Sequence, residues 1–243
     1  MRNPANRANR IGFDGPAAGS APSRCGECRL FRHDCLCDLL PRVETRTRVV
    51  VVLHQLEDHK TSNTGRLAHR CLPNSEIVIR GDPERALRAH LARQAARDGQ
   101  TEAAPDPVAA ATAGPPTAPR WPDWTAHGDP VLLFPHPDAL PLETWRDHGR
   151  PLTLIVPDGT WGQGQRVRHR TPGLAGIPCA AISRAEPSNY RLRTASDPRR
   201  LATLEAIAEA LGILEGDEPR RQLLAIFDVM VQRSLRARCG GPR

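Results

Sequence analysis

Four cysteines near the amino terminus have the spacing of a metal site. Cys25, Cys28, Cys35 and Cys37 lie close together, and two residues separate the first pair. Four thiolates suit a tetrahedral Zn²⁺ ion and leave no open position for a substrate, so we expect a structural zinc site. The alternatives are a chance cluster and a redox pair, although a redox pair normally opens a helix after a strand and no strand pattern precedes Cys25. His33 could substitute as a ligand, but four thiols make that unnecessary.

The segment Pro-Asp-Gly-Thr-Trp at 157–161 directly follows an apolar run. Gly159 permits a sharp turn, which puts Asp158 at the carboxyl end of a strand, where a carboxylate can act as a base or orient a ligand. The alternative is that Asp158 caps a helix that starts near Trp161. Trp161 itself either packs in the core, stacks on a base or faces a cation.

Basic residues gather in two further segments. Tyr190, the only tyrosine, is followed closely by Arg191 and Arg193, a mixture typical of loops that face RNA or another ligand. The alternative is a solvated loop with Tyr190 tucked into the core. Arg166 and Arg168 belong to a dense basic stretch, which by itself indicates only a charged surface.

These residues need strands and helices to position them. Apolar, β-branched runs predict buried strands at 47–53, 77–79, 131–135, 152–156 and 177–182. Capping residues and helical spacing predict helices at 82–97, 202–214 and 218–238, and a helical turn or short helix at 140–145. Such an alternation indicates an α/β fold with a mostly parallel sheet covered on both faces, in which ligands bind beyond the carboxyl ends of the strands.

The 243 residues have room for one sizeable domain with an appendage. We expect a disordered tail at 1–23, a zinc-binding module at 24–40 and the α/β domain at 41–238. A stretch rich in Ala, Pro and Thr at about 98–128 reads as a low-complexity insertion rather than core.

Composition restricts the class of protein. No apolar run is long enough to cross a bilayer and residues 1–23 lack the apolar region of a signal peptide, so we expect a cytoplasmic protein without disulfides. The net charge of +7 favours a polyanionic partner, although nearly all the basic residues are arginines, as a GC-rich genome would also give. No feature indicates a membrane or an obligate protein partner.

Together these segments resemble the DTW-domain family, the tRNA-uridine aminocarboxypropyltransferases, from about residue 25 to residue 235. The resemblance rests on the cysteine cluster and on six segments: His54-Gln55-x-Glu57, Asn63-Thr64-Gly65-Arg66, Leu132-Leu133-Phe134-Pro135, Asp158-Gly159-Thr160-Trp161, Ser188-Asn189-Tyr190-Arg191-Leu192-Arg193 and Leu201-Ala202-Thr203-Leu204-Glu205-Ala206. The chain departs from the family in the insertion, in Ala202 where a serine is usual, and in the glycine-rich segment 162–165.

The resemblance implies a SPOUT-like knotted fold and a reaction with S-adenosyl-L-methionine. The 3-amino-3-carboxypropyl group would be transferred to N3 of a uridine in tRNA, and methylthioadenosine released. Asp158, Thr160, Trp161 and Glu205 would be catalytic. Asp158 is the first choice for the base that takes the N3 proton. Glu205 is the second choice, or it holds the amino group of the ligand.

The same resemblance assigns binding residues. Those for S-adenosylmethionine are Leu133, Phe134, Pro135, Pro157, Gly159, Tyr190, Leu192, Arg193 and Thr203. Those for tRNA are Lys60, Asn63, Thr64, Arg66, Arg166, Arg168 and Arg191. Residues 133–135 would form an apolar wall for adenine, and Arg191 or Arg193 would grip the methionine carboxylate or a phosphate.

Two alternatives to this activity remain open from the sequence. One is methyl transfer to RNA by the same kind of fold, and the other is a zinc-ribbon RNA-binding protein without catalysis. In either case the zinc module, with arginines around its turns, is expected to act as an arm that helps to grip tRNA.

Overall fold

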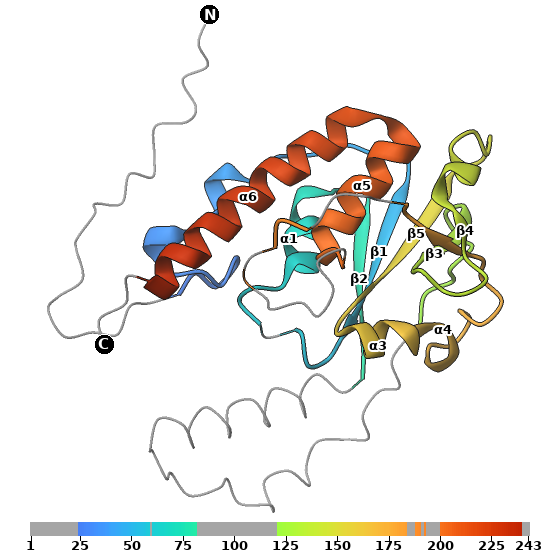
Figure 1. Cartoon of the computed structure of the whole chain (residues 1–243), viewed down its shortest axis with the longest axis horizontal. Helices are drawn as coiled ribbons and strands as arrows, with labels where there is room; N and C mark the ends of the chain where they lie inside the picture. Colours follow the sequence, from blue (N-terminus) through green and yellow to red (C-terminus); the bar gives the residue numbers. More distant parts are fainter. Residues whose placement is uncertain are drawn as a thin grey trace, which may run out of the picture.

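Six strands form a sheet flanked by helices in the computed structural model (Figure 1), which describes residues 24–58, 60–81, 121–183, 188–190, 192 and 200–239. The strands are β1 (Arg48–His54), β2 (Ser75–Arg80), β3 (Asp129–Leu133), β4 (Leu140–Pro141), β5 (Leu152–Asp158) and β6 (Cys179–Ala181). The α-helices are α1 (Thr64–Cys71), α3 (Trp161–Gln165), α4 (Val167–Arg170), α5 (Thr203–Glu215) and α6 (Asp217–Cys239). Short 3₁₀ helices span Arg32–Asp34, Cys37–Leu39 and Leu142–Trp145.

All strand pairs in the sheet are parallel, in the order β2-β1-β5-β3-β6-β4. The predicted α/β class with a mostly parallel sheet is therefore confirmed. In register, Leu53 of β1 lies opposite Asp158 of β5 and Ile79 of β2, so the carboxyl ends of these strands meet at one edge. The segments that follow the strands at this carboxyl edge are thereby brought together.

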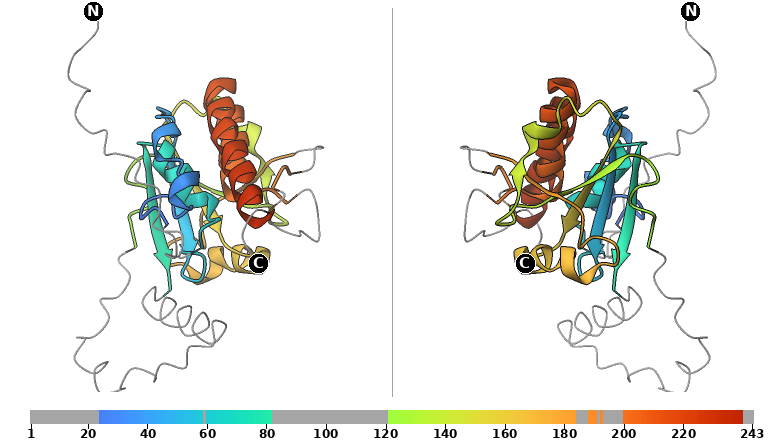
Figure 2. Two further views of the ribbon diagram at one scale, coloured as in Figure 1. Left: turned by 90° about the vertical axis from the view of Figure 1, so that its left-hand side faces the viewer. Right: turned by 90° about the vertical axis from the view of Figure 1, so that its right-hand side faces the viewer.

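Helices and loops cover both faces of the sheet. Successive strand residues point to opposite faces. Val49 and Val51 belong to a core shared with α1, α5 and α6, whereas Val50 and Val52 belong to a second core on the other face. Figure 2 shows α6 lying beside the strands. Burial on both faces explains why the central strands are rich in apolar residues.

The predicted strands are all present, with different ends. We expected the strand after residue 152 to stop at Pro157, but β5 continues through Pro157 to Asp158. The prediction was wrong because a proline removes only one ladder donor and its extended backbone can remain paired, here opposite Val52. The predicted strand at 177–182 is shorter, since β6 spans only Cys179–Ala181.

The two predicted carboxyl-terminal helices correspond to α5 and α6. The sequence analysis predicts no helix at α1, because this short segment is mostly polar, but Asn63 caps a helix there and accepts a hydrogen bond from the N–H of Arg66. Segment 140–145 forms β4 and a 3₁₀ helix. The predicted tail at 1–23 and helix at 82–97 lie outside the described residues.

Most of the predicted insertion at 98–128 also lies outside the described residues. Its last part does not, and there Trp124 is only 6% exposed and packs in the second core. The indole N–H of Trp124 donates to the carbonyl of Pro172 (2.9 Å). The last part of the predicted insertion therefore belongs to the core, and the insertion ends before residue 128.

None of the described helices is long and apolar enough to span a membrane.

Candidate active site and candidate metal centre

A cavity of about 520 Å³ opens at the carboxyl ends of β3, β5 and β6. A volume of this size is typical of sites for small ligands and cofactors. Most of the site residues named from the sequence line it: Lys60, Asn63, Thr64, Leu133, Phe134, Pro135, Pro157, Asp158, Gly159, Thr160, Trp161, Tyr190, Leu192 and Thr203. The fold thus brings together segments that are far apart in the sequence.

Asp158, the last residue of β5, joins three elements at the wall of the cavity. Its Oδ2 accepts a hydrogen bond from Nδ2 of Asn63 (2.8 Å), and its Oδ1 accepts one from Oγ1 of Thr203 (2.8 Å). Asn63 caps α1 and Thr203 opens α5. The carboxylate, on a residue only 8% exposed, is therefore fixed in orientation by the starts of two helices.

The alternative role of Asp158 as a helix cap is wrong. The capping position of α3 belongs to Thr160, whose N–H donates to Oε1 of Gln163 (2.7 Å). Gln163 also donates to Nδ1 of His54 (3.2 Å), at the end of β1. Burial, and then the charge of Arg80, lower the pKa of His54, so its imidazole stays neutral near pH 7.

Gly65 makes room for the Asp158 carboxylate. A Cβ on Gly65 would lie 2.3 Å from Oδ2 of Asp158, closer than any side chain can approach. Gly65 lies in the first turn of α1, directly beside the strand end. A residue without a side chain is therefore required for α1 to pack this closely against Asp158.

Aromatic side chains form one wall of the cavity. Phe134 and Trp161 contact each other with ring centroids 5.0 Å apart. The close packing of α3 against Phe134 needs Gly164, because a Cβ there would lie 2.6 Å from the phenyl ring. The guanidinium of Arg200 stacks over Trp161 at 4.6 Å and also lines the cavity. Sequence reasoning missed Arg200, since nothing local distinguishes it from the other arginines.

Glu205, the second candidate for a base, does not line the cavity in the described residues. It is 2% exposed and accepts hydrogen bonds from Oγ of Ser188 (2.5 Å), the N–H of Asn189 (2.9 Å) and the N–H of Ala202 (2.8 Å). These bonds tie the segment 188–190 to the start of α5. The geometry points to a positioning role for Glu205 rather than to proton transfer.

Tyr190 combines the two roles considered for it. Its ring packs on Phe227 of α6 with centroids 5.7 Å apart, and its hydroxyl donates to the carbonyl of Ser62 (2.9 Å). Tyr190 also lines the cavity. Its neighbours Arg191 and Arg193 lie outside the described residues.

Three of the predicted tRNA contacts, Arg66, Arg166 and Arg168, do not line the cavity formed by the described residues. Arg66 pairs with Asp58, and burial lowers its pKa. Arg168 pairs with Asp138 (2.7 Å). Arg166 is exposed on the surface between α3 and α4. Of the described residues predicted to contact tRNA, Lys60, Asn63 and Thr64 line the cavity.

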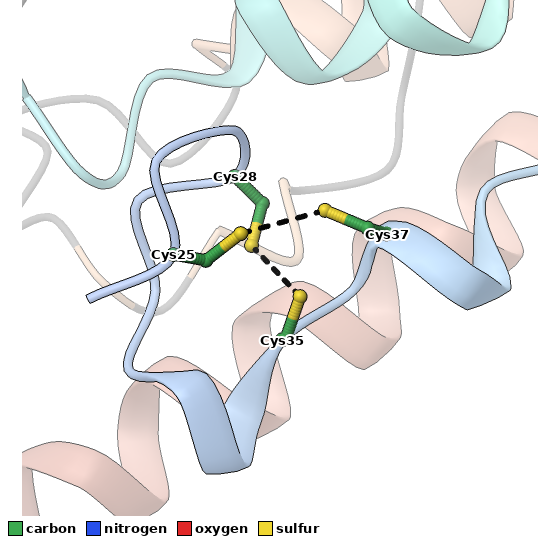
Figure 3. A group of neighbouring side chains, drawn as sticks. All are labelled: Cys25, Cys28, Cys35 and Cys37. Carbon is green, nitrogen blue, oxygen red and sulfur yellow. Dashed lines mark hydrogen bonds between the residues drawn. The ribbon is translucent and has the colours of Figure 1, made fainter. Parts of the chain in front are cut away.

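The four cysteines converge as a metal site requires (Figure 3). Their sulfur atoms all lie within 4.8 Å of one another. The Cys25–Cys37 and Cys28–Cys35 pairs are separated by 3.6 and 3.7 Å. Thiolates bound tetrahedrally at about 2.3 Å from zinc would be about 3.8 Å apart. The residues therefore fit a tetrahedral metal ion.

Nearby groups act on these thiols in opposite directions, because burial raises the pKa of the Cys35 thiol to about 12 whereas hydrogen bonds favour the thiolate at Cys25. The backbone N–H groups of Cys28 and Glu27 lower the pKa of the Cys25 thiol to about 6. Arg70 of α1 donates to Sγ of Cys37 (3.3 Å). A cation at this position offsets part of the negative charge that four thiolates would leave on a divalent ion.

The metal module is part of the main core rather than a separate arm. Leu30 and Leu36, which lie between the metal ligands, are buried with residues of α1 and α6. Arg29 has a left-handed backbone (φ 61°) and donates from its side chain to the carbonyl of Asp58, in the loop before α1. The module therefore contacts the loop that contains the cavity residue Lys60.

Comparison with known proteins agrees with this arrangement. The model of the DTW domain family matches residues 22–235. The chain belongs to the DTW domain family. A tRNA-uridine aminocarboxypropyltransferase 2 from Drosophila melanogaster is 25% identical over 205 residues, which cover 83% of this chain and 70% of that protein.

Two mammalian relatives carry the same name. The proteins from Macaca fascicularis and Mus musculus are 24% and 25% identical over 195 residues, or 79% of this chain. The matched region spans 56% of each of these two proteins. No solved structure matches the chain significantly.

Replacement of Gly65 by alanine should displace the Asp158 carboxylate. We expect Gly65→Ala to lower the free energy of unfolding by about 1–3 kcal/mol, because the new methyl group overlaps Oδ2. Urea unfolding measures the change.

Gly162→Ala in α3 is the matched control, because a Cβ there meets nothing within 4 Å and alanine favours a helix. Equal stabilities of the two variants would contradict the close packing of α1 on Asp158.

Proposed function

We propose that this chain is a tRNA-uridine aminocarboxypropyltransferase. It transfers the 3-amino-3-carboxypropyl group of S-adenosylmethionine to N3 of a uridine in tRNA and releases methylthioadenosine. Family membership and the names of the relatives support tRNA modification. The observation that carries the proposal is a fixed carboxylate, Asp158, on the wall of a cavity that also has an aromatic wall.

The cavity residues fit S-adenosylmethionine by chemical type. Leu133, Phe134 and Pro135 offer an apolar surface for adenine, and Trp161 offers an aromatic face that attracts a cationic sulfonium. Arg200 provides a positive group for the methionine carboxylate. The co-substrate supplies an electrophilic carbon next to a sulfonium, and the side chains must present that carbon, rather than the methyl, to the uracil ring.

Asp158 acts as the general base in this proposal. Its carboxylate takes the proton from uracil N3, the nitrogen forms the new bond to carbon, and the carbon–sulfur bonding pair leaves with the neutral thioether. The hydrogen bonds from Asn63 and Thr203 hold the carboxylate in one orientation throughout. Thr160 belongs to the same wall of the cavity. Lys60, Asn63 and Thr64 also line the cavity and would contact the tRNA in this proposal.

We also propose that the bound metal is zinc and that the chain follows the knotted path of SPOUT-like enzymes. The tetrahedral arrangement of four thiols supports zinc. The position of β5 between β1 and β3, with a cavity where their carboxyl ends meet, is consistent with such a fold.

Asp158→Asn tests the base. The amide can donate to Thr203 and accept from Asn63, so the variant should fold and bind S-adenosylmethionine by calorimetry with little change in affinity. Without a base, release of methylthioadenosine in the presence of tRNA should fall about 10²- to 10⁴-fold.

Asp147→Asn, at an exposed position, is the control for the charge change. Near-normal turnover of Asp158→Asn would eliminate the base role. Release of S-adenosylhomocysteine by the unmodified protein would show methyl transfer instead, and no binding of S-adenosylmethionine would favour a non-catalytic RNA-binding protein.

Metal removal tests the zinc centre. We expect about one zinc ion per chain by elemental analysis, and we expect a chelator to lower Tm by about 10 °C, because Leu30 and Leu36 pack in the core only while the ligands hold their turns. Zinc, but not magnesium, should restore Tm. A metal-free protein with unchanged Tm would contradict the structural role.

A further inference from the structure

Three arginines lie at the carboxyl edge of the sheet, outside the cavity. Arg80 is the last residue of β2 and is in register with His54, the last residue of β1. Arg166 joins α3 to α4, and Arg170 ends α4. Figures 1 and 2 show α3 and α4 at this end of the strands.

These three guanidinium groups lack acidic partners among the residues that the structure describes. Some arginines elsewhere in the described residues form ion pairs, as Arg48 does with Glu76 and Arg168 with Asp138. No such pair involves the three, and Nε of Arg80 is buried without a hydrogen-bond partner. The acidic groups of the nearby loop are already paired, Glu57 with Lys60 and Asp58 with Arg66.

Arg80 adjoins His54 in the sheet, and His54 contacts Gln163 of α3, so Arg80 lies at the same end of the sheet as the segment 166–170. Burial, followed by the charges of Arg170 and then Arg166, lowers the pKa of Arg80. Converging positive groups without a counter-charge are unfavourable in the free protein, and a bound anion relieves the repulsion. Arg166 and Arg170 are exposed, so an anion can reach them from solvent.

A short chain of contacts connects this cluster to the cavity. Arg80 is next to His54 in the sheet. Nδ1 of His54 lies 3.2 Å from Nε2 of Gln163, and Oε1 of Gln163 accepts a hydrogen bond from the N–H of Thr160 (2.7 Å). Thr160 lines the cavity. A polyanion bound at the arginines would therefore lie at the same edge of the sheet as the candidate active site.

We propose that Arg80, Arg166 and Arg170 bind phosphates of the tRNA backbone next to the uridine that enters the cavity. This inference rests on the proposed function, because it assumes that tRNA is the substrate. Guanidinium groups on an open surface suit consecutive phosphodiesters, which position a nucleic acid without reading its sequence. Of the two basic-stretch residues named from the sequence, Arg166 belongs to the cluster, and Arg168 is neutralised by Asp138.

Two variants test this surface. One is the single variant Arg80→Gln, and the other is the double variant Arg166→Gln with Arg170→Gln. Fluorescence anisotropy with labelled tRNA, at several salt concentrations, should show binding about tenfold weaker for the double variant. Loss of two phosphate contacts should also reduce the slope of log Kd against log salt by about 1.5. The Arg80→Gln variant should reduce this slope by about half as much as the double variant, because it removes one phosphate contact instead of two.

Arg221→Gln is the matched control. Arg221 pairs with Glu218 near the start of α6. The preceding helix, α5, ends at Glu215, which accepts a hydrogen bond from the N–H of Thr47 at the amino end of β1. This end of the sheet is opposite to the edge that bears the three arginines. The tRNA affinity and salt slope of Arg221→Gln should equal those of the unmodified protein. In turnover assays the double variant should raise KM for tRNA and leave KM for S-adenosylmethionine unchanged.

Two results would overturn the inference: no binding of tRNA by the unmodified protein, or equal affinity and salt slope in the double variant and the control. The proposed function fails differently. If tRNA binds through the three arginines but no methylthioadenosine is released, the binding surface stands and the transfer activity is excluded.

Discussion

The hydrogen bonds to the Asp158 carboxylate are the constraint on which the site depends. Asn63 caps α1 and Thr203 opens α5, and the two helix starts are also joined by a hydrogen bond from the N–H of Leu204 to Oγ1 of Thr64 (3.4 Å). A single carboxylate thus fixes the end of β5 relative to two helices. This convergence explains why Gly65 must lack a side chain, and why the cavity wall is formed by segments that are distant in the sequence.

The metal module also contacts α1, the helix whose cap Asn63 holds Asp158. Arg70, near the end of α1, contacts the thiol of Cys37, while Asn63 at the other end of α1 holds Asp158. Arg29 of the cysteine turn donates to the carbonyl of Asp58, whose carboxylate pairs with Arg66 of α1. Through these contacts the module is connected to elements that line the cavity. We therefore expect it to help position the site as well as to stabilise its own turns.

Charge is distributed unevenly around the site. In the loop before α1 the carboxylates are each paired with a basic side chain. At the adjacent surface of α3 and α4, Arg80, Arg166 and Arg170 have no acidic partner within the described residues. Part of the positive charge of this chain, whose net charge is +7, therefore lies unneutralised at the edge of the sheet that bears the cavity, which favours a polyanion approaching from that side.

Features that depend on near neighbours could be predicted from the sequence. Cysteine spacing indicated the cluster that could hold a metal ion, apolar runs indicated the strands, and the turn at Gly159 put Asp158 at a strand end. Three other features could be seen only after folding: Glu205 anchors the segment 188–190, Arg200 lines the cavity, and Arg80 lies near Arg166 and Arg170. The reason is physical: the role of a charged side chain depends on the partners that folding brings to it, and these partners lie many residues away.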